Sequence, residues 1–123
     1  MSICFYNKNI FPGKDVVELT KHEELILLAI LKLEENAYLI TLRRHIKEIT
    51  GKSINYGSLC NTLSALIRKE CITSAESDPV PRQGGRRKVL YSLTAEGKRA
   101  LLHAYRIQKL AWDGLVKTIL KFD

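Results

Sequence analysis

The sequence predicts a mainly α-helical fold with one small β-hairpin. Apolar residues recur at intervals of three and four over much of the chain, which is the spacing of one face of a helix. In the second half, two short stretches rich in β-branched and aromatic residues flank a loop that contains prolines and glycines, as in a hairpin. With 123 residues, the chain is long enough to bury a core within a single domain.

The chain is strongly basic. It carries 20 lysines and arginines against 13 acidic residues, a formal charge of +7. An excess of this size on a small domain suggests a polyanionic partner, with nucleic acid ahead of an anionic membrane surface. A soluble basic protein without such a partner is the plainer alternative.

The cysteines and the hydropathy indicate the cellular location of the protein. Cys4, Cys60 and Cys71 form no C-x-x-C pair and no Cys/His cluster, so we expect a reducing compartment, no metal and no cofactor. Cys60 and Cys71 are expected to be small core residues rather than a redox pair. The N-terminal stretch does not resemble a signal peptide, and the longest apolar run, Leu25 to Leu31, is too short to span a bilayer. We therefore expect a cytoplasmic protein without membrane contact.

The first two helices follow an arm. Residues 1–19 show no period and are expected to form an N-terminal arm. Thr20 and Glu23 have the spacing of a capping box, and the helix that follows is apolar nearly all round, so it should be central in the fold. A second helix should end at Gly51, which can adopt the left-handed conformation. Its apolar stripe consists of Leu39, Leu42, Ile46 and Ile49.

A short turn leads to a third helix, for which Asn55 or Ser53 can serve as N-cap. Small and polar side chains let one face of this helix lie close against another surface. The apolar stripe of the helix consists of Leu59, Leu63, Leu66 and Ile67. The small, polar face consists of Ser58, Asn61, Thr62, Ala65 and Arg68.

A hairpin and a last helix complete the chain. Residues 71–77 and 87–93 are predicted strands, and Thr94 is expected to cap a final helix that runs through Trp112 towards Ile119. Two helices joined by a tight turn and followed by a two-stranded hairpin make a winged helix-turn-helix. We assign this domain to residues 20–93 and a C-terminal dimerisation helix to residues 94–123.

The tip of the hairpin is the most basic part of the sequence. Arg82, Arg86, Arg87 and Lys88 surround two glycines. Arginine binds phosphate through its planar fork, and glycine allows a close approach. We expect this wing to contact the DNA backbone; a solvated loop is the alternative.

The stretch from Asn36 to Leu101 resembles the PadR family of bacterial transcriptional regulators. The segment "YGSLCNTLSALIRKECI" is similar to the family's recognition helix, and "GGRRKVLYSLTAEGKRAL" is similar to its wing and the start of its last helix. Cys60 and Asn61 depart from the tyrosine and proline that are usual there. The chain resembles the short members, which have a single C-terminal helix.

The resemblance implies a homodimeric repressor that binds near-palindromic double-stranded DNA and is released by a signal. In the family the dimer is built through the C-terminal and first helices, and short members can bind flat hydrophobic molecules at its centre. We therefore expect a dimer or effector role for the apolar residues of the last helix. These residues are Leu101, Tyr105, Trp112, Leu115 and Ile119. For Trp112, packing in the dimer and contact with an effector both remain open.

The residues expected to contact DNA lie on the second and third helices and on the wing, with phosphate contacts from basic side chains and base contacts from polar ones. They are Arg43, Lys52, Tyr56, Ser58, Asn61, Thr62, Arg68, Arg82, Arg86, Arg87 and Lys88.

Other functions are less well supported. A winged-helix module that binds protein would need an apolar recognition face, and a small-molecule carrier would not need a basic wing. No arrangement of residues suggests catalysis, so we do not expect an enzyme.

Overall fold

The structure, a computed structural model, describes residues 16–76 and 88–121. It is mostly helical with one antiparallel hairpin, which confirms the predicted fold class. The elements are α2 (Lys21–Leu33), the 3-10 turn η1 (Glu34–Asn36), α3 (Leu39–Thr50), α4 (Tyr56–Arg68), β1 (Ile72–Glu76), β2 (Val89–Leu93), α5 (Ala95–Trp112) and α6 (Leu115–Leu120). Residues 1–15 of the expected N-terminal arm (1–19) lie outside the described residues, as do the wing-tip residues Arg82, Arg86 and Arg87.

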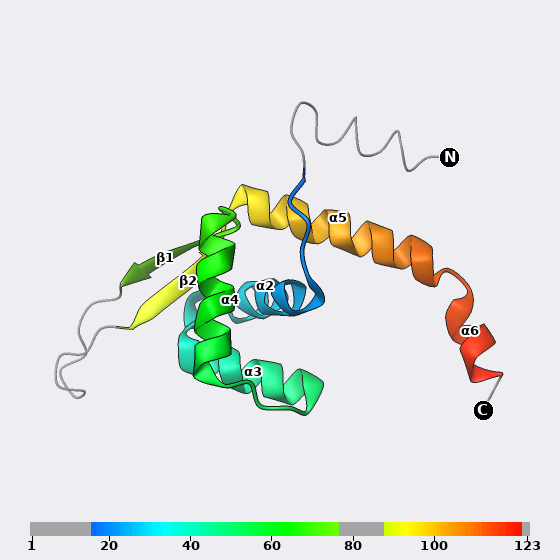
Figure 1. Ribbon diagram of the computed structural model, residues 1–123, viewed down its shortest axis with the longest axis horizontal. Coiled ribbons are helices and arrows are strands. Elements are labelled where there is room, and N and C mark those ends of the chain that lie inside the picture. Colours follow the sequence, from blue (N-terminus) through cyan, green and yellow to red (C-terminus); the bar gives the residue numbers. More distant parts are fainter. Residues whose placement is uncertain (1–15, 77–87, 122–123) are drawn as a thin grey trace.

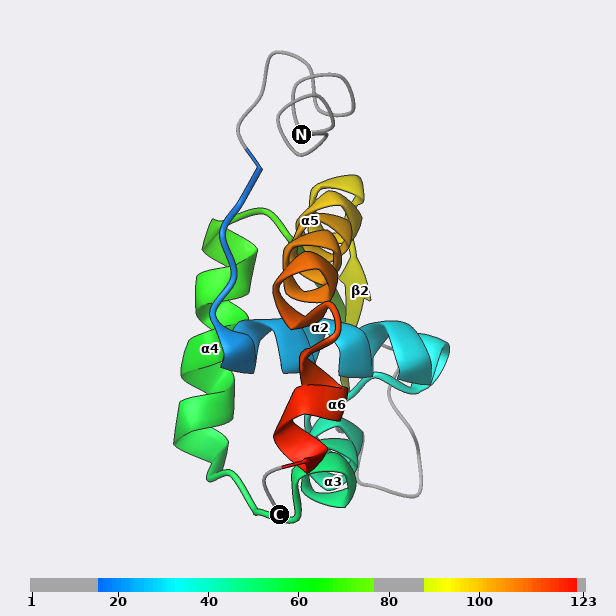
Figure 2. The same cartoon turned by 90° about the vertical axis from the view of Figure 1, so that its right-hand side faces the viewer.

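Helix α2 is the centre of the fold, as its all-round apolar pattern predicts. It contacts α3, α4 and α5, and in the view along α5 it crosses between α5 and α3 with α4 to one side (Figure 2). Its Ile26, Leu27 and Ile30 are almost fully buried. They meet Leu42 of α3 and Leu63 of α4 in one hydrophobic core. The three helices thus share a single apolar interior.

The helix ends are set by the residues that the sequence indicates. The Thr20 hydroxyl accepts a hydrogen bond from the N–H of Glu23 (3.1 Å), and the Glu23 carboxylate accepts one from the N–H of Thr20 (2.9 Å). Asn55 caps α4 and Thr94 caps α5 by one bond each: the side chain accepts from the N–H of the residue three positions on. Gly51 closes α3 with φ of 80°, in the left-handed region. These local bonds fix the turns between helices.

The hairpin projects from one side of the helical core (Figure 1). Ile72 pairs with Leu93 and Glu76 with Val89, so the two strands are in full register. The N–H of Tyr91 donates to the carbonyl of Ala37 (3.0 Å), which ties the wing to the break between α2 and α3. The base of the wing is therefore part of the folded domain.

The final helix is shorter than predicted. Helix α5 ends at Trp112, and Gly114, with φ of 74°, turns the chain before α6 begins at Leu115. Asp-Gly is a common turn pair, and a residue with positive φ cannot continue an α-helix. The single helix expected over 94–123 is therefore wrong. Helix α6 lies at the far end of α5, on the opposite side of the molecule from the wing (Figure 1).

Three positions differ in burial from what periodicity predicts. Ile49 and Ile67, placed on apolar stripes, are 56% and 41% exposed. Ile49 lies in the last turn of α3, and Ile67 lies at the edge of its stripe, one position after the fully buried Leu66. Cys60 is also exposed, whereas Cys71 is buried as expected. Cys60 directly follows the buried Leu59, and the next residue along a helix turns away from the core.

Candidate nucleic-acid interface

Helix α4 presents a small, polar face to solvent. Its first turn is fixed by the Asn55 side chain, which accepts a hydrogen bond from the N–H of Ser58 (2.7 Å). Ser58, Asn61 and Arg68 are exposed and Thr62 is half-buried on the same side of the helix. Because Leu59, Leu63 and Leu66 anchor the opposite side in the core, the polar face is held rigidly outward.

Asn61 and Thr62 differ in what they can offer a base. The hydroxyl of Thr62 donates to the carbonyl of Ser58 (3.0 Å), so its hydrogen is already used within the helix. The exposed side chain of Asn61 makes no hydrogen bond with any described residue, so its amide donor and its carbonyl acceptor are both available. A donor and an acceptor on one side chain can pair with one base edge in the major groove. Asn61 thus has the free donor and acceptor that such a contact requires, and its base contact stays a prediction.

Arg43, which the sequence suggests as a phosphate contact, makes two contacts within its own chain. Its Nε donates to the carbonyl of Ile54 (2.6 Å), in the turn between α3 and α4. Its guanidinium carbon lies 4.6 Å from the centroid of the Tyr56 ring, within the range of a cation–π contact. The half-buried Arg43 is thus a link between α3 and the start of α4. A phosphate contact from the rest of its guanidinium stays a prediction.

Tyr56, expected to contact DNA, is the other half of that link. Its ring is 43% exposed even though one face lies against Arg43. Arg44 and Lys47 on α3 and Lys52 in the turn are exposed. They form a basic border beside α4.

A second cation–aromatic contact lies at the base of the wing. The Nζ of Lys88 lies 4.9 Å from the centroid of the Tyr38 ring, just before the start of α3. The hydroxyl of Thr41 accepts a hydrogen bond from the N–H of Tyr38 (2.9 Å) and so fixes that helix start. No role was expected for Tyr38 from the sequence. The signal that could have indicated one is an aromatic residue directly before the start of a helix.

A cavity of about 540 Å³ lies at the same place, between the start of α3 and the wing. Arg44 and Lys88 give it a basic lining. Its other lining residues are Tyr38, Leu39, Ile40, Thr41, Val89 and Tyr91. The basic border beside α4 is therefore continued towards the wing.

Two ionisable groups next to these elements are kept neutral. Burial raises the pKa of the Cys71 thiol, despite the nearby charge of Lys69, and burial also raises the pKa of the Tyr91 phenol. A raised pKa leaves too little thiolate for reactive chemistry at neutral pH. Cys71 is therefore a structural residue.

Neither a metal centre nor a membrane span is found in the part of the chain that the structure describes. Over residues 16–76 and 88–121, no three His, Cys, Asp or Glu side chains gather where they could hold a metal ion. None of the described helices has both the length and the apolar character needed to cross a membrane.

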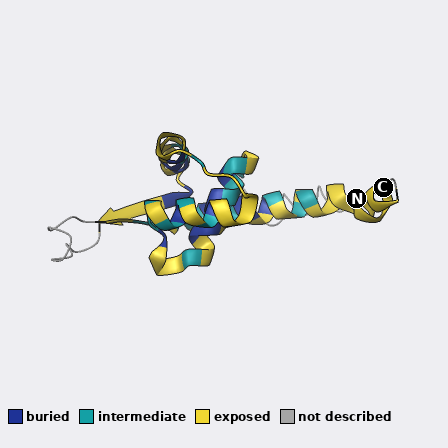
Figure 3. Ribbon diagram, turned by 90° about the horizontal axis from the view of Figure 1, so that it is seen from below, coloured by how far each residue is buried: buried dark blue, intermediate teal, exposed yellow. Residues whose placement is uncertain are grey.

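The C-terminal helices present a large apolar surface. Tyr105 and Trp112 of α5 are 57% and 51% exposed, and the last turn of α5 (109–112) and all of α6 are exposed (Figure 3). Leu115 and Ile119 are likewise exposed, on α6. Leu101 is different, because it is buried in the core of its own chain. Leu101 therefore lies apart from the exposed apolar surface of α5, to which the neighbouring Leu102 belongs; a dimer role for that surface stays a prediction.

Comparisons with known proteins agree with this geometry. The model of the "Transcriptional regulator PadR-like family" matches residues 27–103. Among solved structures, RosR of H. salinarum is similar with a TM-score of 0.65 and 24% identity, over 89% of this chain and 96% of that chain. A PadR family transcription regulator from Clostridium difficile R20291 is similar with a TM-score of 0.56 and 27% identity, over 82% of this chain and 97% of that chain. No curated protein matches the chain. RosR is archaeal, so the bacterial origin expected from the sequence stays a prediction.

Proposed function

Because the chain belongs to the PadR-like family of transcriptional regulators, we propose that it is a homodimeric repressor that binds a near-palindromic operator. A DNA-binding role follows from the family. Repression, the dimer and the operator symmetry are parts of the proposal. So is a cytoplasmic location, where such a regulator would meet its DNA.

The single observation that carries the proposal is the exposed face of α4. Ser58, Asn61 and Arg68 stand outward on a helix whose other side is locked into the core. A recognition helix needs this combination, because base contacts require side chains that are exposed yet held in a fixed position. Lysines and arginines on α3, in the turn and at the wing base would hold the phosphates on either side.

The dimer is supported by the apolar surface of α5 and α6. Solvent-exposed apolar patches of this extent are rare on proteins that stay monomeric. In a two-fold dimer the two α4 helices would meet successive major grooves about 34 Å apart, and the operator would share the symmetry. A hydrophobic small molecule held between the Trp112 side chains would change the angle between the two reading heads and lower operator affinity.

Selection of bound fragments from a random pool of double-stranded DNA tests the proposal. We expect a selected site with two inverted half-sites about one helical turn apart. Sedimentation of the protein at micromolar concentration should give a dimer. A pool that shows no enrichment would exclude sequence-specific binding, and a monomer would exclude the symmetric operator and the central effector site. If the protein selects no DNA but binds a partner protein in a pull-down, a protein-interaction module would be favoured instead.

A further inference from the structure

The cavity between the start of α3 and the wing has the size and the charge of a site for a small anionic molecule. Its volume is about 540 Å³, and pockets that bind small molecules commonly measure about 300–1,000 Å³. Of the described residues that line it, Arg44 and Lys88 are cations and none is an acid. A phosphate, sulfonate or carboxylate group would therefore meet only positive side chains there.

The two cations reach the cavity from different elements. Arg44 of α3 is exposed and forms no hydrogen bond or ion pair with any described residue, so its guanidinium can bind an anion through two parallel bonds. The Nζ of Lys88 lies 4.9 Å from the centroid of the Tyr38 ring, and this contact helps to hold the ammonium group beside the cavity. An anion in the cavity would thus be bound by α3 and by the base of the wing.

The start of α3 adds a third source of positive potential. The first N–H groups of a helix have no acceptor within that helix, and Tyr38, at the N-cap of α3, makes no side-chain cap bond to them. Residues 39–41, which carry these N–H groups, all line the cavity. The positive end of the helix dipole therefore favours an anion in the same place as the two cations.

The rest of the lining is mostly apolar or aromatic, which distinguishes the cavity from a simple phosphate contact. Ile40 of α3 and Val89 of β2 are 58% and 37% exposed. Leu39 and the rings of Tyr38 and Tyr91 line the cavity with them. A DNA phosphate is bound through charge and hydrogen-bond donors, whereas an apolar group beside the anion would cover Ile40 and Val89. The lining thus fits a molecule with an acidic group at one end and an apolar group at the other.

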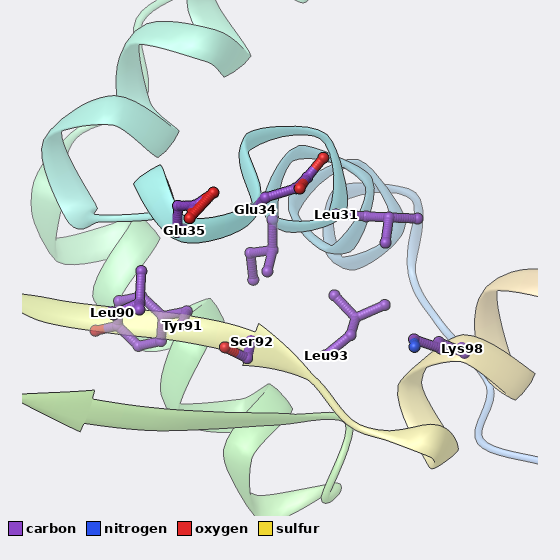
Figure 4. A pocket seen from close by; sticks show the side chains of 9 residues that line it. Leu31, Glu34, Glu35, Leu90, Tyr91, Ser92, Leu93 and Lys98 are labelled. Atoms are coloured by element: carbon purple, nitrogen blue, oxygen red, sulfur yellow. The ribbon is translucent and has the colours of Figure 1, made fainter.

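A second pocket, between the end of α2, β2 and the start of α5, shows the contrast (Figure 4). It is smaller, about 310 Å³, and its charged lining residues are Glu34, Glu35 and Lys98. An anion in that pocket would meet two like charges against one opposite charge. Attraction of anions is therefore a property of the cavity beside α3 and is not shared by every hollow of the surface.

We propose that the cavity lined by Arg44 and Lys88 binds a small amphipathic anion, and that this molecule competes with DNA. The binding follows from the cavity alone. The competition rests on the function proposed above, in which both cations hold DNA phosphates. A ligand that occupies them removes them from DNA, so each partner lowers the affinity of the other. This site is separate from the effector site proposed near Trp112, which lies at the end of α5 away from the wing (Figure 1).

The probe is 1-naphthyl phosphate, which joins one phosphate to a flat apolar ring system. Isothermal titration calorimetry should show saturable binding to the parent protein, and absence of binding overturns the proposal. Inorganic phosphate and 1-naphthol each supply half of this chemistry, so each should bind at least about tenfold more weakly. Equal binding of inorganic phosphate would make the cavity a plain phosphate contact, and equal binding of naphthol would place the probe on an apolar surface; either result overturns the site.

A variant with Arg44→Gln and Lys88→Gln tests the cations. Loss of both charges should raise the dissociation constant of naphthyl phosphate by at least about tenfold. The control carries Lys47→Gln and Lys52→Gln, which remove two exposed charges outside the cavity, and it should bind the probe as the parent does. A thermal melt checks that each variant folds. Equal loss of probe binding in both variants would reveal only general attraction by a basic domain and would overturn the site.

Ile40→Asn tests the apolar part of the cavity. Ile49→Asn is the matched control, because the two isoleucines lie on the same helix and are 58% and 56% exposed, yet only Ile40 lines the cavity. Ile40→Asn should weaken binding of naphthyl phosphate by about fivefold and leave DNA affinity at the parent's value. Ile49→Asn should change neither. Parent-like probe binding in Ile40→Asn would exclude a ligand with an apolar group in this cavity.

Competition is measured by fluorescence anisotropy of a labelled DNA duplex in the presence of the probe. Naphthyl phosphate should release the duplex from the parent at concentrations where sodium phosphate of equal ionic strength does not. Release no greater than that by sodium phosphate would exclude the competition. A protein that binds the probe in the cavity but binds no DNA would remove the proposed function and leave the site standing. A protein that binds DNA but not the probe would do the reverse.

Discussion

Gly97 of α5 lies so close to the backbone of Cys71 that any side chain there would force the two segments apart. A Cβ atom at Gly97 would lie 2.2 Å from the carbonyl oxygen of Cys71. That carbonyl accepts a hydrogen bond from the N–H of Thr94 (3.0 Å), and the Thr94 hydroxyl donates to the carbonyl of Glu70 (2.6 Å). The start of α5 is thereby fixed to the start of β1. The direction in which α5 leaves the domain, and the surface it presents, follow from this contact.

Gly97→Ala should lower the free energy of unfolding by about 1–3 kcal/mol, the usual cost of forcing an extra carbon into a packed site. Gly57→Ala is the control, because its new Cβ would meet only the Asn55 side chain, at an ordinary 3.4 Å. That variant should be neutral or up to about 1 kcal/mol more stable, through higher helix propensity. Urea denaturation gives both values; equal stabilities would show that Cys71 and Gly97 can separate freely.

Arg43→Gln should disturb how α4 is held rather than remove a phosphate contact. The variant loses the cation over Tyr56 and the Nε–H bond to Ile54. We expect a lower ratio of operator to non-specific affinity and a nearly unchanged salt dependence of non-specific binding. The neighbouring Arg44→Gln should do the opposite, reducing the salt slope by about 0.9 for one lost phosphate contact. Fluorescence anisotropy at several salt concentrations measures both, and a slope lowered equally in Arg43→Gln would restore Arg43 as a phosphate ligand.

Asn61→Ala should relax sequence preference at one base pair of each half-site. Loss of a paired donor and acceptor costs about 1–3 kcal/mol of discrimination, while non-specific affinity should change little. Lys52→Gln provides the contrast, because loss of a phosphate contact should weaken binding to all sequences alike. Repeating the selection with each variant decides the matter. A site identical to that of the parent in the Asn61→Ala selection would mean that Asn61 reads no base.

Replacing Arg86 and Arg87 by alanine should weaken binding to every DNA sequence and flatten its salt dependence, because both are expected to contact phosphates. The selected operator should stay the same. The measurement is the slope of the logarithm of affinity against that of salt concentration. If the double variant keeps the parent's slope, the wing tip does not touch DNA.

Stability should fall in acid through Glu23. Burial alone would raise the pKa of this carboxyl, but its hydrogen bonds to Lys69 and Thr20 outweigh burial and hold the pKa below its ordinary value of 4.5. A group with a lowered folded-state pKa contributes stability that is complete above its unfolded pKa and is lost as the pH falls through the folded one. The free energy of unfolding should therefore drop below about pH 5 more steeply in the parent than in Glu23→Gln. Glu48→Gln, a change at an exposed side chain, is the control and should show the same dependence of unfolding free energy on pH as the parent. If Glu23→Gln also shows the parent's dependence, Glu23 does not cause the loss of stability in acid.

The sequence by itself determined the features that depend on neighbours along the chain. Thr20, Asn55 and Thr94 cap helices, and Gly51 ends one, because a cap involves only residues within a single turn. The buried stripe of α4 was predictable for the same reason except at Ile67, since helical periodicity decides which side chains share a face. These local rules were enough to predict the winged helix-turn-helix and the polar face of α4.

Only the tertiary structure decided which side chains of similar type are exposed and which are already in use. Arg43 and Arg44 are adjacent cations, yet only Arg43 meets the carbonyl of Ile54, because that contact depends on how α3 packs beside the turn. Leu101 and Leu102 are identical in chemistry, and the angle at which α5 crosses α2 buries one and exposes the other. Whether a side chain is buried or hydrogen-bonded depends on several elements that pack together. A short stretch of sequence therefore cannot determine it.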